Sequence, residues 1–248
     1  MEMPGVPGLV FAALVVVAAY AVRGTAGFGA QAVAVPLLAL VLPLHVVVPA
    51  ITVVTALASV VAWRRDWRKI FWREILRLLP FTLMGVLIGL YLFKALDPQT
   101  LTRAFGIFVI VYGCVAFATA SRSLPVPARF ARLLGAVLGT ASGLIATVFG
   151  AAAGPLYVIY LNTLRLEKDS FRVTITTILA FQSAFRVAGY AQLGFYNGTV
   201  ALLIVAFLPL MLLGSRMGNA IAGRIDQHRF NLGVGVLLLA SGVVLLLK

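Results

Sequence analysis

Apolar runs long enough to cross a lipid bilayer recur from one end of this sequence to the other. Hydrophobic residues make up 62% of the 248 residues and charged residues 11%, whereas soluble domains are about half apolar and about a quarter charged. Lipid offers no partners for backbone polar groups, so apolar spanning segments fold as helices. The sequence predicts an all-α polytopic integral membrane protein with about 8–10 membrane segments, given that a crossing takes roughly 20 apolar residues.

The formal net charge of +13 has a simple explanation in a membrane protein. Lys and Arg accumulate in cytoplasmic loops and set the orientation, so the charge does not indicate a nucleic-acid partner. Cys114 is the single cysteine, and the sequence contains no nucleophile elbow, phosphate loop or cluster with metal-ligand spacing. We therefore expect no enzyme activity, no metal and no cofactor, with the lipid bilayer and a small molecule as partners.

Glycine and proline positions repeat along the chain. Gly24 and Pro36 recur as Gly143 and Pro155, an offset of 119 residues. A second register of 129 residues relates Pro80, Gly85, Gly89, Asp97, Gly106 and Gly113 to Pro209, Gly214, Gly218, Asp226, Gly235 and Gly242. The ten-residue difference falls near "YAQLGFYNGT", a loop present only in the second copy. The sequence predicts an N-terminal repeat over 1–120, a linker over 121–130 and a C-terminal repeat over 131–248.

Each half contains five apolar segments, of which the first two are short. Three arrangements of the short segments remain open: separate crossings, half-helices that meet near the midplane, or one long broken helix. The expected segments are 8–22, 26–42, 45–63, 75–93 and 100–120, then 131–147, 149–161, 170–190, 198–220 and 229–247.

The distribution of basic residues favours five crossings per half, which makes the second half inverted relative to the first. With the N-terminus outside, this topology places most of the 20 Lys and Arg residues in the cytoplasm, whereas four crossings per half split them almost evenly. The inverted arrangement therefore obeys the positive-inside rule better. It predicts a multi-pass protein of the inner or plasma membrane, with basic loops 64–77 and 122–132 on the cytoplasmic side.

Two repeat-related breaks interrupt the apolar segments: "GTAGFGAQAVAVP" and "GLIATVFGAAAGP". Glycines in these breaks (Gly27, Gly29, Gly150 and Gly154) can expose backbone amides at half-helix N-termini, which favour anions. Pro36 and Pro155 close the two segments, and Gln31 is a strongly polar side chain within the first. Close helix packing is the alternative role for the glycines. Matching interruptions in inverted repeats indicate the binding site of a secondary transporter.

Polar side chains on later helices are expected to flank that site. Thr55 and Thr174 are predicted as its walls, and Gln182 as an orienting donor beside Gln31. Arg186 lies within an apolar run, where it either attracts an anion or extends to the headgroups. The acidic residues fall at predicted loops or helix ends. We therefore hypothesise that an anion leaves down the membrane potential without obligatory proton coupling, while Na⁺ binding by unwound carbonyls stays open.

The segments "GFGAQAVAVPLL" and "FGAAAGPLYVIYL", together with length and duplication, resemble the TauE/SafE family of membrane transporters, often described as sulfite exporters. The chain departs from the family pattern at Ala30 to Ala32 and Ala151 to Ala153, where glycines are common. The resemblance implies export of sulfite or a small organosulfur anion such as an organosulfonate. An anion channel, a Na⁺-coupled carboxylate carrier, a membrane scaffold and a membrane-embedded enzyme are the alternatives. The oligomeric state is open, with a homodimer as one option.

Overall fold

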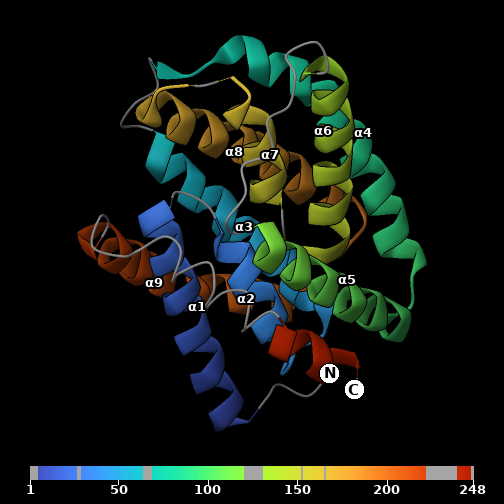
Figure 1. The fold of residues 1–248 in the computed structure, drawn as a ribbon. Coiled ribbons are helices and arrows are strands. Elements are labelled where there is room, and N and C mark those ends of the chain that lie inside the picture. Colours follow the sequence, from blue (N-terminus) through green and yellow to red (C-terminus); the bar gives the residue numbers. More distant parts are fainter. Residues whose placement is uncertain are drawn as a thin grey trace.

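The structure is a computed structural model that describes residues 5–26, 29–63, 69–119, 131–151, 153–164, 166–221 and 239–246. Within these ranges every regular element is a helix, which confirms the all-α class (Figure 1). The first half contains α1 Val6–Ala26, α2 Ala30–Leu38, α3 Leu44–Trp63, α4 Trp72–Ala95 and α5 Pro98–Thr119. The second contains α6 Ala131–Phe149, α7 Ala153–Asn162, α8 Lys168–Gln192 and α9 Gly198–Ile221, and a further helical segment covers 239–246.

Several helices have the length and composition of membrane spans. Among the described residues, three stretches are long and apolar enough to cross a bilayer: Val6–Thr25, Trp72–Ala95 and Gly198–Ala220. Shorter apolar stretches lie at Leu44–Val60 in α3 and Leu133–Phe149 in α6. These spans agree with a protein that crosses the membrane several times.

The helices α2 and α7 are only half as long as a membrane crossing. They contain 9 and 10 residues, which corresponds to about 14–15 Å at 1.5 Å per residue. A left-handed glycine precedes each of them, Gly29 with φ 96° and Gly150 with φ 69°. This backbone region is readily available only to glycine. Of the three arrangements left open by the sequence, the observed lengths favour half-helices.

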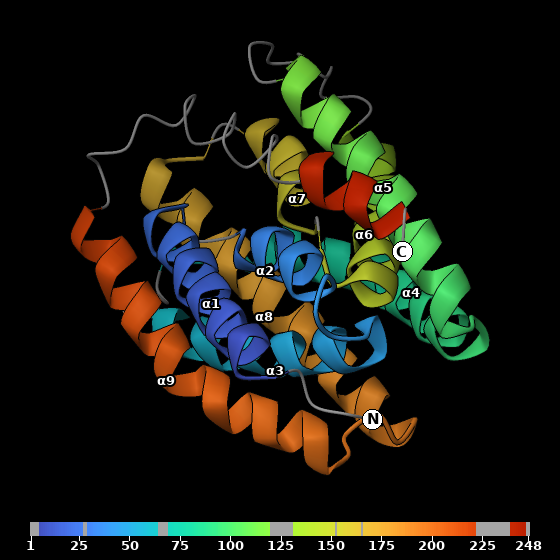
Figure 2. The same cartoon turned by 90° about the horizontal axis from the view of Figure 1, so that it is seen from below.

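Helices of one half pack closely on helices of the other. The helix α4 lies along α6, and α1 lies along α9 (Figures 1 and 2). Glycines make both crossings possible, because a Cβ atom at Gly85 or Gly143 would collide with the backbone of the facing helix. The same holds for Gly214 and Gly218 against α1. Small residues at such crossings let helix backbones approach each other closely.

Both of these helix pairs run parallel, since residue numbers rise in the same direction along the two partners. The contacts are Leu78 with Gly139, Thr82 with Gly143 and Gly89 with Thr147 for α4 and α6, and Val17 with Gly214 and Ala21 with Gly218 for α1 and α9.

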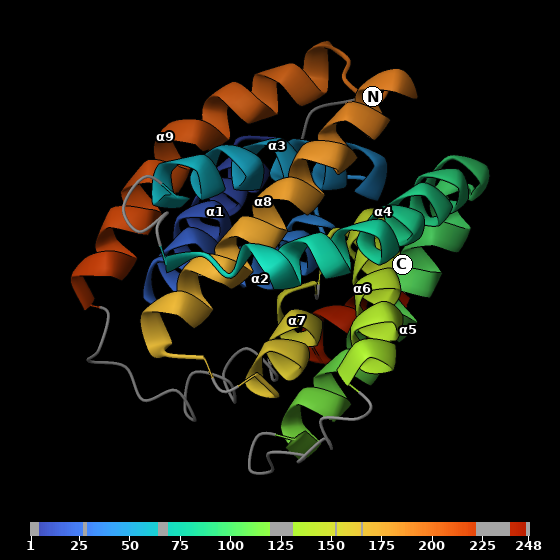
Figure 3. The same cartoon turned by 90° about the horizontal axis from the view of Figure 1, so that it is seen from above.

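The interior is organised around α3 and α8. The helix α8 packs against α3 on one side and against α4 and α7 on the other (Figure 3). Buried apolar side chains form two clusters. The larger one is centred on α1, α2 and α3, and the smaller one packs the first turns of α4 and α8 around α7. The polar side chains of α3 and α8 therefore lie inside the protein, close to the two half-helices.

The predicted basic loops are only partly visible. The helix α4 begins at Trp72, so Arg73 and Arg77 belong to its first two turns and not to a loop. Residues 64–68 and 120–130, which include the predicted linker, lie outside the described part of the chain.

Candidate substrate-binding site

A small cavity lies where the two half-helices begin. The space open to the centre of a water-sized sphere is about 20 Å³, enough for about one water molecule. The first residues of α2 and α7 meet there, although they are distant in sequence. The lining residues are Gly29, Ala30, Gln31 and Ala32 at α2, Ala153, Gly154 and Pro155 at α7, with Arg23 of α1, Thr55 of α3, and Leu179 and Ser183 of α8.

The helix starts give this cavity a positive electrostatic potential. Amides in the first turn of a helix have no intrahelical partner, and the helix dipole places partial positive charge there. Gly29 occupies the N-cap position of α2, and the Ala32 amide donates to its carbonyl at 3.1 Å, so the first-turn amides left for a ligand are those before Ala32. Two such helix starts facing one cavity create an environment that favours an anion.

Arg23 adds a full positive charge to the cavity wall. Its side chain is 6% exposed, and Nη2 donates to Ser59 Oγ at 2.8 Å. Among the described residues no carboxylate pairs with it, because the ion pair found there joins Arg77 and Glu74. A buried charge without a counterion is costly. An anion in the cavity is the natural partner for this guanidinium.

Hydroxyl groups on α3 form a hydrogen-bond network next to Arg23. The Ser59 hydroxyl donates to the Thr55 carbonyl at 2.9 Å, and the Thr55 hydroxyl shares a hydrogen bond of 2.8 Å with the Tyr20 hydroxyl. These side chains are buried. The arginine is therefore oriented by a polar face of α3 within an otherwise apolar core.

Arg186 lies one helical turn beyond Ser183 on α8. It is 1% exposed, so it does not extend to the headgroups, and the alternative of a snorkelling arginine is wrong. Its Nη2 donates to Thr52 Oγ1 at 2.8 Å and its Nη1 to Gln31 Oε1 at 3.5 Å. The guanidinium also lies 5.9 Å from the ring centre of Tyr190. A second buried arginine thus contacts a residue of the cavity wall.

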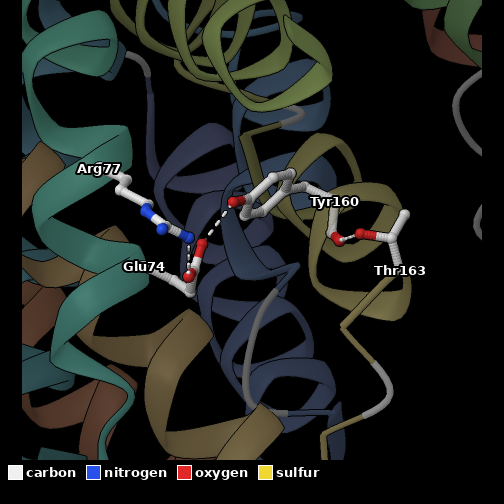
Figure 4. A network of polar contacts seen from close by, with 4 residues as sticks. All are labelled: Glu74, Arg77, Tyr160 and Thr163. Carbon is white, nitrogen blue, oxygen red and sulfur yellow. Dashed lines mark hydrogen bonds and ion pairs between the residues drawn. The ribbon is translucent and has the colours of Figure 1, made fainter. Parts of the chain in front are cut away.

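A buried carboxylate fixes the far end of α7 (Figure 4). Glu74 in the first turn of α4 is 4% exposed, pairs with Arg77 at 2.5 Å and accepts a hydrogen bond from the Tyr160 hydroxyl at 2.6 Å. Thr163 donates in turn to the Tyr160 carbonyl at 2.7 Å. Glu74 is at a helix end, as the sequence indicates, but it is buried and structural in character.

The sequence comparisons identify the family. Residues 11–245 match the profile of the family described as Sulfite exporter TauE/SafE. The chain belongs to the TauE/SafE family. It is also similar to the probable inner membrane transporter protein TsaS of Comamonas testosteroni, with 28% identity over 196 residues, or 76% of this chain and 77% of that protein. No solved structure matches the chain.

Family membership confirms the resemblance and the broad function. A TauE/SafE chain with apolar helices of spanning length is a membrane transporter and not an enzyme.

Five of the residues predicted for the site of this TauE/SafE protein come together in the structure. They line the cavity: Gly29, Gln31, Thr55, Gly154 and Pro155. Arg186 lies beside them through its contact with Gln31.

The other predicted site residues lie elsewhere. Pro36 is buried within α2, and the Cα of Gly150 faces Val35 and Val48, since a Cβ there would lie 3.1 Å from each. Thr174 Oγ1 accepts a hydrogen bond from the Phe71 amide at 3.1 Å. Gln182 donates from Nε2 to the Ser142 carbonyl at 2.9 Å, which ties α8 to α6. Gly27 lies outside the described residues.

Two polar residues of the cavity were not among the predicted site residues, namely Arg23 and Ser183. Arg23 directly precedes the first glycine-rich break, which is a signal for a charge at the break. Ser183 lies three residues before Arg186, so both fall on one face of α8.

Proposed function

We propose that this TauE/SafE protein exports a small sulfur oxyanion, sulfite or an organosulfonate, through the cavity between α2 and α7. The observation that carries the proposal is Arg23, a buried arginine without a carboxylate partner among the described residues, placed beside the starts of two half-helices. The arginine supplies charge, and the helix starts supply directed amide donors. The family description, Sulfite exporter, points to the same class of anion.

The two halves, 1–120 and 131–248, are proposed to be inverted repeats. Three observations support this. Tyr20 contacts Thr55 and Arg23 contacts Ser59, so α1 and α3 run parallel. His45 at the start of α3 is hydrogen-bonded to the Phe93 carbonyl near the end of α4, so α3 and α4 run antiparallel. Since α4 runs parallel to α6, the first helices of the two halves, α1 and α6, point in opposite directions.

The proposed topology places the Arg23 end of α1 toward the cytoplasm. An outside N-terminus and inverted halves put the basic segments 64–77 and 122–132 on that side, in agreement with the positive-inside rule. The relative TsaS carries the name probable inner membrane transporter protein, and we propose the same membrane for this protein. Arg23 is then the first buried charge that an anion leaving the cytoplasm meets.

The membrane potential supplies the driving force in this proposal. An inside-negative potential contributes about 2.3 kcal/mol per charge per 100 mV to the efflux of an anion. Among the residues that line the cavity there is no carboxylate or histidine, and Glu74 is engaged by Arg77 and Tyr160. Proton coupling is therefore not required.

Flux in proteoliposomes tests the proposal. Sulfite, sulfoacetate and acetate are offered at equal pH, with a potential imposed by K⁺ and valinomycin. Saturable flux of a sulfur anion that rises with the potential is expected, together with counterflow, which separates a carrier from a channel. Na⁺-dependent acetate flux without sulfite flux would favour a Na⁺-coupled carboxylate carrier, and folded protein that moves none of these anions would contradict the proposal.

A further inference from the structure

Three residues of the described part of the chain carry a buried polar side-chain atom without a hydrogen-bond partner. These atoms are Gln31 Nε2, Arg186 Nε and Tyr196 Oη. Unpartnered buried polar groups are rare in folded proteins and need an explanation. Arg186 and Gln31 are neighbours, because Nη1 of Arg186 contacts the Gln31 side chain at 3.5 Å.

Tyr196 lies in the loop between α8 and α9, directly after Phe195. The ring centre of Phe195 is 6.1 Å from that of Tyr190, and the Arg186 guanidinium lies 5.9 Å from the same Tyr190 ring. Burial raises the pKa of the Tyr196 hydroxyl, Tyr190 adds to that rise, and the positive charge of Arg186 opposes it. The neighbouring Phe195 anchors the loop. Its ring lies 5.0 Å from that of Phe93 and 5.7 Å from that of His45. This loop belongs to the stretch that is present only in the second half of the sequence.

All three unpartnered atoms are able to donate a hydrogen bond. The amide of Gln31 directs its oxygen at the arginine, which leaves the NH₂ group free, and the opposite orientation would place two donors together. Arg186 Nε–H is a donor, and the Tyr196 hydroxyl carries a proton. A ligand with several acceptor oxygens satisfies all three groups, whereas a cation satisfies none of the donors. The chemical class indicated is an oxyanion.

This group is distinct from the cavity at Arg23. The two arginines bind different hydroxyls of α3, Arg23 at Ser59 and Arg186 at Thr52. Seven residues of helix separate these hydroxyls, or about 10 Å along the axis. The two guanidinium groups are therefore held at points two helical turns apart on α3. Arg186 and Tyr196 do not line the cavity, while Gln31 lines it and contacts Arg186.

We propose that Arg186, Gln31 and Tyr196 form a second oxyanion subsite, next to the Arg23 cavity on the transport path. This inference rests on the proposed anion transport. An anion leaving the Arg23 cavity passes Gln31, whose amide is shared by both subsites, and is received by Arg186 beneath the α8–α9 loop. Two sites arranged one after the other along the path allow an ion to bind tightly enough to enter and weakly enough at each site to leave.

Equilibrium dialysis of the purified full-length protein with ³⁵S-sulfite tests the inference, with chloride holding the ionic strength constant. The wild-type protein is expected to approach two bound sulfite ions per chain. The variants Arg23→Gln and Arg186→Gln are each expected to retain one. Arg103→Gln, which removes an exposed arginine, is the matched control and is expected to retain two.

The Tyr196→Phe variant gives an independent readout, because it removes only the unpartnered hydroxyl. The thermal midpoint without sulfite is expected to stay the same or rise, since a buried unsatisfied group is lost. The weaker of the two sulfite affinities is expected to fall about tenfold, as for a hydrogen bond to a charged group. A merely structural Tyr196 would give the reverse, a lower midpoint with unchanged binding.

The possible failures are distinguishable. One sulfite per wild-type chain, lost in Arg23→Gln but unchanged in Arg186→Gln and Tyr196→Phe, would overturn the second subsite and leave the cavity site intact. Absence of sulfite binding to folded wild-type protein would overturn the proposed function itself.

Discussion

Arg23 and Ser59 are joined by a hydrogen bond of 2.8 Å inside the protein, where both residues are buried. Arg186 and Thr52 make the same contact at the same distance, one face of α3 serving both arginines. Each guanidinium is thus held by a neutral hydroxyl, which orients it without cancelling its charge. This is the arrangement expected of a group that exchanges anions, because a permanent carboxylate partner would compete with the substrate.

Removing the hydroxyl that orients Arg23 should weaken transport without abolishing it. Ser59→Ala is expected to raise the sulfite concentration for half-maximal flux about tenfold, because a hydrogen bond from a charged group is worth about 1.5–3 kcal/mol. The measurement is concentration-dependent sulfite flux in proteoliposomes. Thr102→Ala, which removes a hydroxyl bonded to the Pro98 carbonyl near the protein surface, is the control. Equal half-maximal concentrations in both variants would show that Ser59 does not position the arginine.

The left-handed backbone at Gly29 should be necessary for the cavity. A Cβ at Gly29 has space, with Val22 Cγ1 at 3.6 Å, so Gly29→Ala is resisted by its φ of 96° and not by crowding. The expected strain of about 1–2 kcal/mol should shift the start of α2 and lower flux. Gly139→Ala, at a glycine without positive φ whose Cβ would have its nearest neighbour at 3.4 Å, serves as the control, with little change in thermal midpoint and normal flux. Normal flux in Gly29→Ala would contradict a role for the start of α2 in transport.

The glycine crossing of α4 and α6 should be intolerant of added atoms. Gly85→Ala places a Cβ against the backbone of Thr140, whereas the nearest atom to a Cβ at Gly139 is 3.4 Å away. Overpacking of a tight contact costs about 1–3 kcal/mol, so Gly85→Ala should lower the thermal midpoint in detergent by several degrees. Gly139→Ala should change it little. Similar midpoints for the two variants would contradict the close approach of these helices.

Glu74 should be needed for the stability of the fold but not for coupling anion transport to protons. Glu74→Gln removes the ion pair with Arg77 while an amide still contacts Tyr160, so the thermal midpoint should fall and potential-driven sulfite flux should persist. With the potential clamped at zero, a pH gradient should drive no sulfite uptake in the wild-type protein. If the pH gradient drove uptake in the wild type but not in Glu74→Gln, Glu74 would be identified as a proton-carrying group. That result would contradict transport without proton coupling.

The helices were largely predictable from the sequence because apolar runs and their glycine and proline breaks are local signals. The breaks at Gly29 and Gly154 mark the cavity for the same reason. The orientation of side chains was not predictable. Thr55 and Thr174 look equivalent in the sequence, because each is a threonine within a predicted membrane helix. The rotation of each helix about its axis places Thr55 at the cavity and Thr174 against the Phe71 amide.

The sequence also does not predict which charged residues near helix ends are buried. Arg23 is three residues from the end of α1, where an arginine commonly reaches water, but it is buried beside Ser59 of α3 and the starts of α2 and α7. Glu74 looks like a loop residue in a segment, 64–77, that has six basic residues, but α4 already begins at Trp72 and Tyr160 of α7 contacts its carboxylate. In both cases the decisive partner comes from a distant part of the chain.

The most direct measurement is the initial rate of potential-driven sulfite flux for Arg23→Gln beside wild type and Arg103→Gln, in proteoliposomes with equal amounts of folded protein. Loss of a buried charged partner costs about 2–5 kcal/mol, so Arg23→Gln should reduce kcat/KM about 30-fold or more, while Arg103→Gln should match the wild type. Wild-type flux in Arg23→Gln would contradict the claim that the cavity at Arg23 binds the transported anion.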